Sequence, residues 1–334
     1  MASIVARAPL RIALGGGGTD LPSHYREHGG FVVSTAIDRY VHIVVSTDLQ
    51  PRFRLKHLEW EDVEDPADVR HPILREVLAR HWAGGGMELA SVGDAPPGTG
   101  LGSSGAYTVC AIRALQAAAG HGPDRGELAE AACEIEIDVL GRQVGKQDQY
   151  AASFGGLRSY SFNPDDSVDV GELDVPERVR DALRDDFLLF FTGQERSASD
   201  VLSGQVSGTR AGDASVRRAL ERLHELGRAT CSAMEAGDLA KCAELLNEQW
   251  EAKRGRAPGT VTDEMDALRD RALRAGGLGA VPLGAGGGGF VLVYTPDPER
   301  TRGELTDVPE LSFAPDSGGC VAHARPFGMA GQQG

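Results

Sequence analysis

The stretch from Asp94 to Ala106, DAPPGTGLGSSGA, constrains the fold more than any other part of the sequence. Two prolines precede four glycines within eight residues, and an alanine-rich run that is typical of a helix follows. Glycines let a backbone approach a ligand closely, and the free N–H groups at the start of a helix favour an anion. The stretch therefore predicts an anion site made of backbone amides, and the neighbouring elements decide which kind.

Two common nucleotide-binding arrangements are excluded by the surroundings of this loop. Gly100, Gly102 and Gly105 satisfy G-x-G-x-x-G, but a dinucleotide-binding fold places a second strand and an acidic residue roughly 20 residues later. Here a helix is predicted to follow a helix from residue 103 to residue 140. A Walker A loop needs a lysine before its Ser or Thr, and PPGTGLGSSG contains no lysine. Neither arrangement is expected.

Ser103 and Ser104 leave two interpretations of the loop open. In the first, backbone amides at the helix N-terminus cradle a phosphate, and the two hydroxyls are available to the phosphate or to a metal ion. In the second, the loop is a glycine turn whose serine only caps the helix. Residues elsewhere in the chain have to decide between them.

The composition argues against two classes of partner, nucleic acids and membranes. The net charge of −15 and the absence of a basic stripe argue against nucleic acid as a partner. No apolar run approaches the roughly 20 residues that span a bilayer, and the first fifteen residues do not resemble a signal peptide, so we expect a cytoplasmic protein without a membrane partner. Five scattered cysteines without a C-x-x-C pair indicate neither a disulfide framework nor a zinc site.

Two further glycine-rich segments accompany the first. GGGGTD occupies residues 15–20, and GAGGGG occupies residues 284–289. Each of the three segments adjoins a strand-like run, at residues 4–14, 87–92 and 290–294 respectively. Three such segments in one chain predict one shared site.

The remaining pattern predicts a mixed α and β organisation in two parts. A polar, acidic segment with two prolines at 163–179 predicts a boundary near 165–186, which gives domains 1–175 and 186–334. Asp124 and Glu127 form a capping box for a helix that ends at Gly141. Further strands are expected in 31–47 (one or two), at 187–193 and at 320–325, and further helices from 103 or 104 to near 120 and at about 213–235, 237–253 and 261–275.

Glu136 is predicted to lie on an apolar flank of its helix. Its helical neighbours are Ala132, Cys133, Val139 and Leu140, and a carboxylate among such residues is costly unless it is paired. We therefore expect Glu136 to face a cation. Glu134, in contrast, shares its face with other acidic residues, which is typical of a solvated surface.

Asp148 lies between two glutamines in VGKQDQYAASFGG. Its helical neighbours are small, and a carboxylate held among amides and small residues can accept a proton or hold a cation. The alternative is that Asp148 only caps its helix or pairs with Lys146.

PPGTGLGSSGA, GKQDQYAASFGG, GGGGTDLP and LGAGGGGF together resemble the motifs of the GHMP kinases, in the order of that superfamily. RIALGGGGTDLPSHYREHGGFVVSTAIDRYVHI, GKQDQYAA and TGQERSAS are most similar to the branch of heptose 7-phosphate kinases and fucokinase-like enzymes. The resemblance implies an α+β fold in two domains, with an N-terminal domain like domain 2 of ribosomal protein S5, a ferredoxin-like C-terminal domain, and the ligands between them.

The resemblance also implies roles for individual residues. Asp148 is the catalytic aspartate that takes the proton of the acceptor hydroxyl, and Arg11 lies beside it; the alternative for Arg11 is an exposed arginine at a strand edge. Ser104 with Glu136 holds Mg²⁺. The ATP phosphates are bound by the loop Pro97, Gly98, Thr99, Gly100, Leu101, Gly102, Ser103 and Ser104.

For the acceptor, the resemblance points to the first and third glycine-rich segments. Gly17, Gly18, Thr19 and Asp20 match the part of the first motif that contacts the sugar, and Gly286, Gly287 and Gly288 lie in the third. Arg196, in TGQERSAS, is a hypothesis for the substrate's own phosphate; its alternative is a helix-start arginine in solvent. The sequence departs from the branch at Val281 and Pro282, which replace a Lys-Leu pair, so that a cation near the phosphates is missing.

The expected function is that of a sugar kinase that uses ATP and Mg²⁺. The first expected activity is phosphorylation of the anomeric hydroxyl of D-glycero-D-manno-heptose 7-phosphate, which gives the 1,7-bisphosphate. Two alternatives remain, a fucokinase-like kinase of an unphosphorylated sugar and a non-catalytic protein of the GHMP fold that senses a nucleotide or a sugar. The expected partner is a small sugar or sugar phosphate, and a homodimer is left open.

Overall fold

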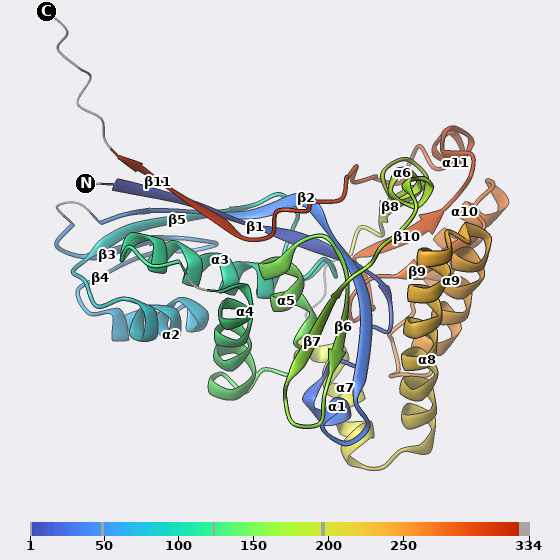
Figure 1. Cartoon of the computed structure of the whole chain (residues 1–334), viewed down its shortest axis with the longest axis horizontal. Coiled ribbons are helices and arrows are strands. Elements are labelled where there is room, and N and C mark those ends of the chain that lie inside the picture. The colour runs from blue at the N-terminus through green and yellow to red at the C-terminus, as the bar shows by residue number, and fades with distance from the viewer. Residues whose placement is uncertain (1, 48–49, 123, 195–197, 327–334) are drawn as a thin grey trace, which may run out of the picture.

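The protein is described as a computed structural model that covers residues 2–47, 50–122, 124–194 and 198–326. A large sheet lies at one end of the molecule and a small sheet with long helices lies at the other (Figure 1). The first two glycine-rich segments lie in the half with the large sheet, and the third lies between two strands of the small sheet, so how they meet follows from how these two parts pack.

The large sheet has the order β11-β1-β2-β5-β3-β4, and β6 and β7 extend it beside β2. The one or two strands expected in 31–47 are a single strand that ends at Ser46, in which residues 30–35 of β2 pair with β6 and residues 41–46 pair with β5. The strands of this sheet are β1 (Ala2–Gly15), β2 (Gly30–Ser46), β3 (Phe53–Lys56), β4 (Trp60–Val63), β5 (Met87–Gly93), β6 (Leu157–Phe162), β7 (Val168–Glu172) and β11 (Val321–Pro326).

Helices α2 to α5 cover one face of this sheet (Figure 1). The predicted helix after the glycine loop is α3, whose buried alanines and aliphatic residues pack on β1 and β2. Asp124 caps α4 as predicted, because its carboxylate accepts hydrogen bonds from the N–H groups of Gly126 and Glu127. The helices of this half are α1 (Pro22–His28), a 3-10 turn (Pro66–Asp68), α2 (Pro72–His81), α3 (Ser103–Ala118), α4 (Arg125–Cys133), a π-helical segment (Glu134–Val139) and α5 (Gln147–Phe154).

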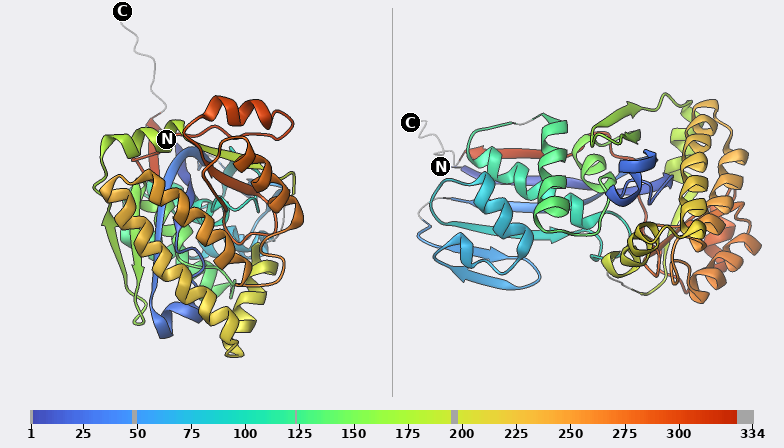
Figure 2. Two further views of the ribbon diagram at one scale, coloured as in Figure 1. Left: turned by 90° about the vertical axis from the view of Figure 1, so that its right-hand side faces the viewer. Right: turned by 90° about the horizontal axis from the view of Figure 1, so that it is seen from below.

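The small sheet is antiparallel with the order β8-β10-β9, and the neighbouring α8 and α9 form the far end of the molecule (Figure 2). The three predicted helices of this half are confirmed, and each begins after a side-chain cap, at Asp213, Asp238 and Thr262. Its elements are α6 (Glu177–Asp185), β8 (Phe187–Phe191), α7 (Ala198–Arg210), α8 (Ala214–Ala236), α9 (Leu239–Arg254), α10 (Asp263–Arg274), β9 (Gly279–Pro282), β10 (Phe290–Tyr294) and α11 (Pro298–Glu304).

The last strand returns to the first half of the chain. β11 pairs antiparallel with β1, from Ala2 opposite Pro326 to Arg7 opposite Val321. The strand expected at 320–325 is thus confirmed as a member of the large sheet, while the domain division at residues 175 and 186 stays a prediction. Among the described helices, none combines the length and the apolar character that crossing a membrane requires.

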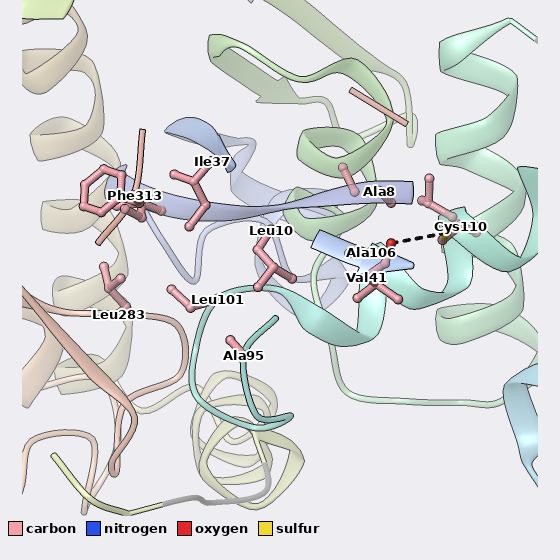
Figure 3. Close-up of a cluster of buried hydrophobic side chains, with 14 of the residues drawn as sticks. Ala8, Leu10, Ile37, Val41, Ala95, Leu101, Ala106, Cys110, Leu283 and Phe313 are labelled. Atoms are coloured by element: carbon pink, nitrogen blue, oxygen red, sulfur yellow. Dashed lines mark hydrogen bonds between the residues drawn. The ribbon is translucent and has the colours of Figure 1, made fainter. Parts of the chain in front are cut away.

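One hydrophobic cluster anchors the glycine-rich segments. Leu101 in the middle of the second segment and Leu283 at the start of the third are both buried in the cluster that contains Leu10 of β1 (Figure 3). A buried leucine restricts the motion of its loop, because exposing such a side chain to water costs about 2 kcal/mol. The apolar residues within these polar loops therefore fix where the loops lie.

His24 of α1 makes the stability of the fold depend on pH. The side chain is buried, and in the described part of the chain neither ring nitrogen has a hydrogen-bond partner. Burial, together with the charges of His28 and His224, lowers the pKa of His24 to about 4. Because this folded-state pKa lies below the ordinary value, the protonated form favours the unfolded chain, and stability is lost as the pH falls from about 6.5 to about 4.

We expect His24→Phe to remove this part of the acid sensitivity. At pH 4 the variant should gain up to about 3 kcal/mol in the free energy of unfolding relative to the parent, and the gain should shrink towards pH 7.5. Urea unfolding at several pH values measures it. His121→Phe, at an exposed position outside this helix, is the control, and equal pH profiles for His24→Phe and the parent would contradict the assignment.

Candidate active site

A cavity of about 1000 Å³ lies where the three glycine-rich segments meet. An apolar part of its wall comes from Leu58, Ile73, Val92 and Tyr107. The glycine-rich segments contribute Gly17 and Gly18 from the first, Gly98, Gly100 and Gly102 from the second, and Gly284 and Ala285 from the third. The structure thus brings the three segments to one place, as their composition predicts.

The second and third segments touch through their backbones. Gly100 has a φ of 86°, and a Cβ atom there would lie 2.7 Å from the carbonyl oxygen of Leu283. Gly284 has a φ of 60°, and its Cβ would lie 2.6 Å from the Cα of Gly100. Both the left-handed conformation and the close approach require glycine at these two positions.

Helix α3 begins at this contact. Its N-cap residue is Gly102, in the left-handed conformation, and no side chain caps the helix. Ser103 and Ser104 are therefore the first two helical residues, and both line the cavity. The interpretation of a serine as a plain N-cap is wrong, because glycine takes that place and leaves the amide groups of the first turn to a ligand.

Arg11 and Asp148 form an ion pair in the cavity wall. Arg11 Nε donates to Asp148 Oδ1 at 2.8 Å, its Nη2 lies 2.5 Å from the same oxygen, and Nη1 donates to the carbonyl of Gly100. The Arg11 side chain is 6% exposed, so it is not an exposed strand-edge residue, whereas Asp148 at 29% remains accessible from the cavity. Lys146 pairs with Glu130 instead of Asp148.

Gly105 sets the distance between α3 and the carboxylate of Asp148. A Cβ on Gly105 would lie 2.7 Å from the Cβ of Asp148 and 2.9 Å from the backbone N of Gln149. We expect Gly105→Ala to lower kcat roughly 100-fold by displacing α5, since a misplacement near 1 Å can cost that much. Gly303→Ala, a helix glycine whose Cβ would meet nothing within 4 Å, is the matched control. Similar kcat values for the two variants would contradict the prediction.

Glu136 is fully buried, and it lies where the helix changes from the α to the π type. The helix that begins as α4 widens into the π-helical segment that contains Glu136, as helices often do at functional sites. Thr108 Oγ1 and Gln149 Nε2 both donate to Oε1 at 3.0 Å. Ser104 Oγ donates to Oε2 at 2.5 Å. These bonds hold one carboxylate oxygen beside the first turn of α3.

Arg142 places a cation against both Ser104 and Glu136. Its Nη1 lies 2.7 Å from Ser104 Oγ and 2.9 Å from Glu136 Oε2. Within the described ranges no group of three or more His, Cys, Asp or Glu residues is placed to hold a metal. Mg²⁺ commonly binds through one or two carboxylates together with substrate phosphates and water, so a carboxylate and a hydroxyl beside an anion site fit this ion. Sequence reasoning missed Arg142.

Asp20 closes the first motif with a buried carboxylate. Oδ1 accepts from the N–H of Gly18 at 3.0 Å, and Oδ2 accepts from the N–H of Gln147 at 3.2 Å, at the start of α5. Burial raises the pKa of Asp20, and the charge of Asp148 raises it further. Asp20 lines the cavity and is a suitable acceptor for sugar hydroxyl groups.

Several residues of the predicted set lie behind the cavity wall. Thr19 is fully buried and ties the carbonyls of Gly16 and Phe31 together. Thr99 and Leu101 are 1% exposed and face the protein interior, and Pro97 lines the cavity. Gly286, Gly287 and Gly288 pack against Thr260 and Gln194 instead of lining the cavity. Arg196 lies outside the described residues.

Two buried cations at the end of α9, one in its last turn and one just after it, were missed by sequence reasoning. Lys253 Nζ donates to the carbonyl of Pro282 at 2.5 Å, beside the buried Val281. A basic side chain thus reaches β9, where Val281 and Pro282 replace the Lys-Leu pair of the branch. Burial, however, lowers the pKa of Lys253 well below its usual value. Arg256 lines the cavity directly. In the sequence, KRGR is indistinguishable from the solvated basic end of a helix.

Comparisons with known proteins follow the same segments. Residues 71–156 match the family GHMP kinases N terminal domain, and residues 230–304 match GHMP kinases C terminal. The chain is similar to the D-glycero-alpha-D-manno-heptose 7-phosphate kinase of Campylobacter jejuni, with 27% identity over 315 residues that cover 90% of this chain and 91% of the relative. It is also similar to the L-fucokinase/L-fucose-1-P guanylyltransferase of Bacteroides fragilis, with 24% identity over 90% of this chain but 36% of that protein.

A solved structure has the same fold. Galactokinase from Lactococcus lactis, complexed with galactose, superimposes with a TM-score of 0.77 at 20% identity and covers 96% of this chain and 95% of its own. The first matched family segment contains the loop 97–104, Glu136 and Asp148, and the second contains the loop 284–289. With both family segments present in order on the two-domain α+β fold, the chain belongs to the GHMP kinases.

Proposed function

We propose that this chain, an ATP-dependent sugar kinase, phosphorylates the anomeric hydroxyl of D-glycero-D-manno-heptose 7-phosphate and so forms the 1,7-bisphosphate. The observation that carries the proposal is the Arg11–Asp148 pair in a cavity between three glycine-rich backbones. Phosphoryl transfer depends on positioning, charge neutralisation and a group that receives the nucleophile's proton. The similarity to a heptose 7-phosphate kinase along nearly the whole chain supports the choice of acceptor.

The two ligands divide the cavity according to its chemistry. The apolar side chains Leu58, Ile73 and Val92 suit a nucleoside, and the first turn of α3 with the loop before it suits the phosphates. Asp20 and the turn before it suit the hydroxyl groups of a sugar. Asp148, near both Asp20 and the start of α3, is in the place where the two ligands have to meet.

Asp148 receives the proton in the proposed reaction. The acceptor oxygen forms a bond to the γ-phosphorus, the bond from that phosphorus to the ADP oxygen breaks, and the hydroxyl proton passes to the Asp148 carboxylate. Arg11 holds this carboxylate through two contacts to one oxygen, which leaves the other oxygen available to the hydroxyl. Arg11 also contributes positive charge beside the developing negative charge.

Ser104 and Glu136 are the residues that would hold Mg²⁺. When bound, the ion would neutralise charge on the nucleotide phosphates. Thr108 and Gln149 keep the Glu136 carboxylate oriented for this purpose. Together with the helix amides, this arrangement explains how a loop without lysine can bind a nucleotide.

A substrate panel tests the proposed function. Purified protein is incubated with ATP, Mg²⁺ and one acceptor at a time, and ADP release is measured with heptose 7-phosphate, the free heptose, L-fucose and D-galactose. The highest kcat/KM is expected for heptose 7-phosphate. A preference for an unphosphorylated sugar would replace the proposal by a fucokinase-like activity, and folded protein that binds ATP but turns over no acceptor would favour a sensor.

A further inference from the structure

Arg256 is a buried arginine in the wall of the cavity, two residues after the end of α9. The residue is 1% exposed. Nη1 donates to the carbonyl of Gly17 at 3.3 Å, and Nη2 donates to the carbonyl of Ala285 at 2.5 Å. Arg256 therefore links the first and third glycine-rich segments, while its Nε has no hydrogen-bond partner among the residues that the structure describes.

The charge of Arg256 is not balanced by an ion pair within the part of the chain that the structure describes. The oxygens that accept from its guanidinium, those of Gly17 and Ala285, are neutral carbonyls. Burial lowers its pKa to about 10, and the charge of Asp20 opposes this shift, so the guanidinium keeps its proton at neutral pH. A buried charge without a direct ion pair is costly, and an anionic ligand in the cavity would supply that ion pair.

Asp20 connects Arg256 with the reacting end of the cavity. The charge of Asp20 acts on Arg256, and the charge of Asp148 acts on Asp20. A Cβ on Gly18 would lie 2.6 Å from Arg256 Nη1, and the N–H of Gly18 donates to Asp20. The turn of the first motif thus carries the sugar-binding carboxylate and lies directly against the guanidinium.

Gly17 leaves room in the cavity beside this turn. Its φ is not positive, and an added Cβ would meet nothing within 4 Å. Neither the backbone conformation nor the packing of the chain therefore requires glycine at this position. The space that a side chain would fill remains part of the cavity that Arg256 lines.

We propose that Arg256 binds the phosphate monoester that the acceptor sugar already carries, and thereby selects a phosphorylated sugar over the free sugar. This inference rests on the proposed function, since the acceptor hydroxyl is taken to lie at Asp148. A guanidinium is suited to the task because its planar donors match phosphate oxygens. Arg256 thus takes the role that the sequence suggests for Arg196.

The matched variants are Arg256→Gln and Arg254→Gln, with Arg256→Lys as an intermediate. Arg254 is an exposed neighbour that pairs with Asp266, so its replacement changes the same charge outside the cavity. Binding of heptose 7-phosphate and of the free heptose is measured by calorimetry without ATP, and kcat/KM is measured for both sugars. ATP-induced thermal stabilisation shows that each variant is folded.

Arg256→Gln is expected to raise the Kd of heptose 7-phosphate roughly 100-fold and to change that of the free heptose little, because a buried charge partner is lost. Arg256→Lys should fall between Arg256→Gln and the parent, and Arg254→Gln should match the parent. Equal losses for both sugars, or no loss for heptose 7-phosphate, would overturn the inference.

The same variants also distinguish a folding defect and a failure of the proposed function from a failure of the inference. If Arg256→Gln does not fold, Arg256→Lys decides, and a loss that is not selective for the phosphorylated sugar overturns the inference. If the unaltered protein turns over neither sugar, the proposed function fails, whereas turnover of heptose 7-phosphate without selectivity in the variants leaves that function intact and removes the role of Arg256.

Discussion

Asp148→Asn is expected to lower kcat by roughly 1,000-fold, within the range found for general bases. An amide cannot take the hydroxyl proton, while its oxygen can still accept from Arg11 Nε, which holds the carboxylate at 2.8 Å. Arg11 also keeps its bond to the carbonyl of Gly100, so the wall of the cavity should remain intact. The measurement is single-turnover ADP formation, combined with the Kd of ATP, which should change little.

Asp138→Asn provides the control for this result. Asp138 is 60% exposed and lies 3.9 Å from Arg26, too far to contribute much. Its kcat should equal that of the parent protein. The proton-transfer role would be ruled out by an Asp148→Asn enzyme that keeps more than a tenth of the parental kcat, or by a kcat loss that merely follows weaker ATP binding.

Glu136→Gln is the second change with a large expected effect. Removing the charge beside Ser104 should raise the Mg²⁺ concentration for half-maximal activity roughly 100-fold, as changes around metal sites do. The new amide oxygen can still accept from Thr108 and Gln149, so the fold should tolerate the change. Activity is titrated with Mg²⁺ at constant free ATP, and saturation at high Mg²⁺ should restore part of it.

Two matched variants make this test specific. Glu134→Gln changes an exposed carboxylate two residues away and should leave the Mg²⁺ titration unchanged. Arg142→Gln removes the guanidinium that lies against Ser104 and Glu136, and it should lower the Mg²⁺ requirement because the competing cation is gone. An unchanged titration in Glu136→Gln would show that the ion binds elsewhere.

The sequence predicted the elements of this protein because their signals are local. The helix after the glycine loop, the cap at Asp124 and the three later helices depend on residues within a few positions of each other, and all are observed. Glu136 could be singled out because its apolar neighbours are at helical spacing. It is buried in the structure, but its role as a metal ligand stays a prediction.

The sequence does not show which residues of the predicted site line the cavity, because lining a cavity is not a local property. Thr19, Thr99 and Gly286 belong to the right motifs, yet they face Phe31, Pro96 and Thr260 and support the loops from behind. Which residue of a glycine-rich segment meets a ligand depends on the φ and ψ angles of the whole turn. Those angles are determined by packing against elements far away in the sequence.

The sequence by itself determined the glycine-rich loops, the helix that begins behind the second of them and the two carboxylates Glu136 and Asp148. Only the tertiary structure decided which cationic side chains contact these loops and carboxylates. Arg256 contacts a carbonyl 239 positions away, and Arg11 contacts a carboxylate 137 positions away. An arginine at a helix end has the same local pattern whether it extends into water or is buried, and the packing of the two halves of the chain makes that choice.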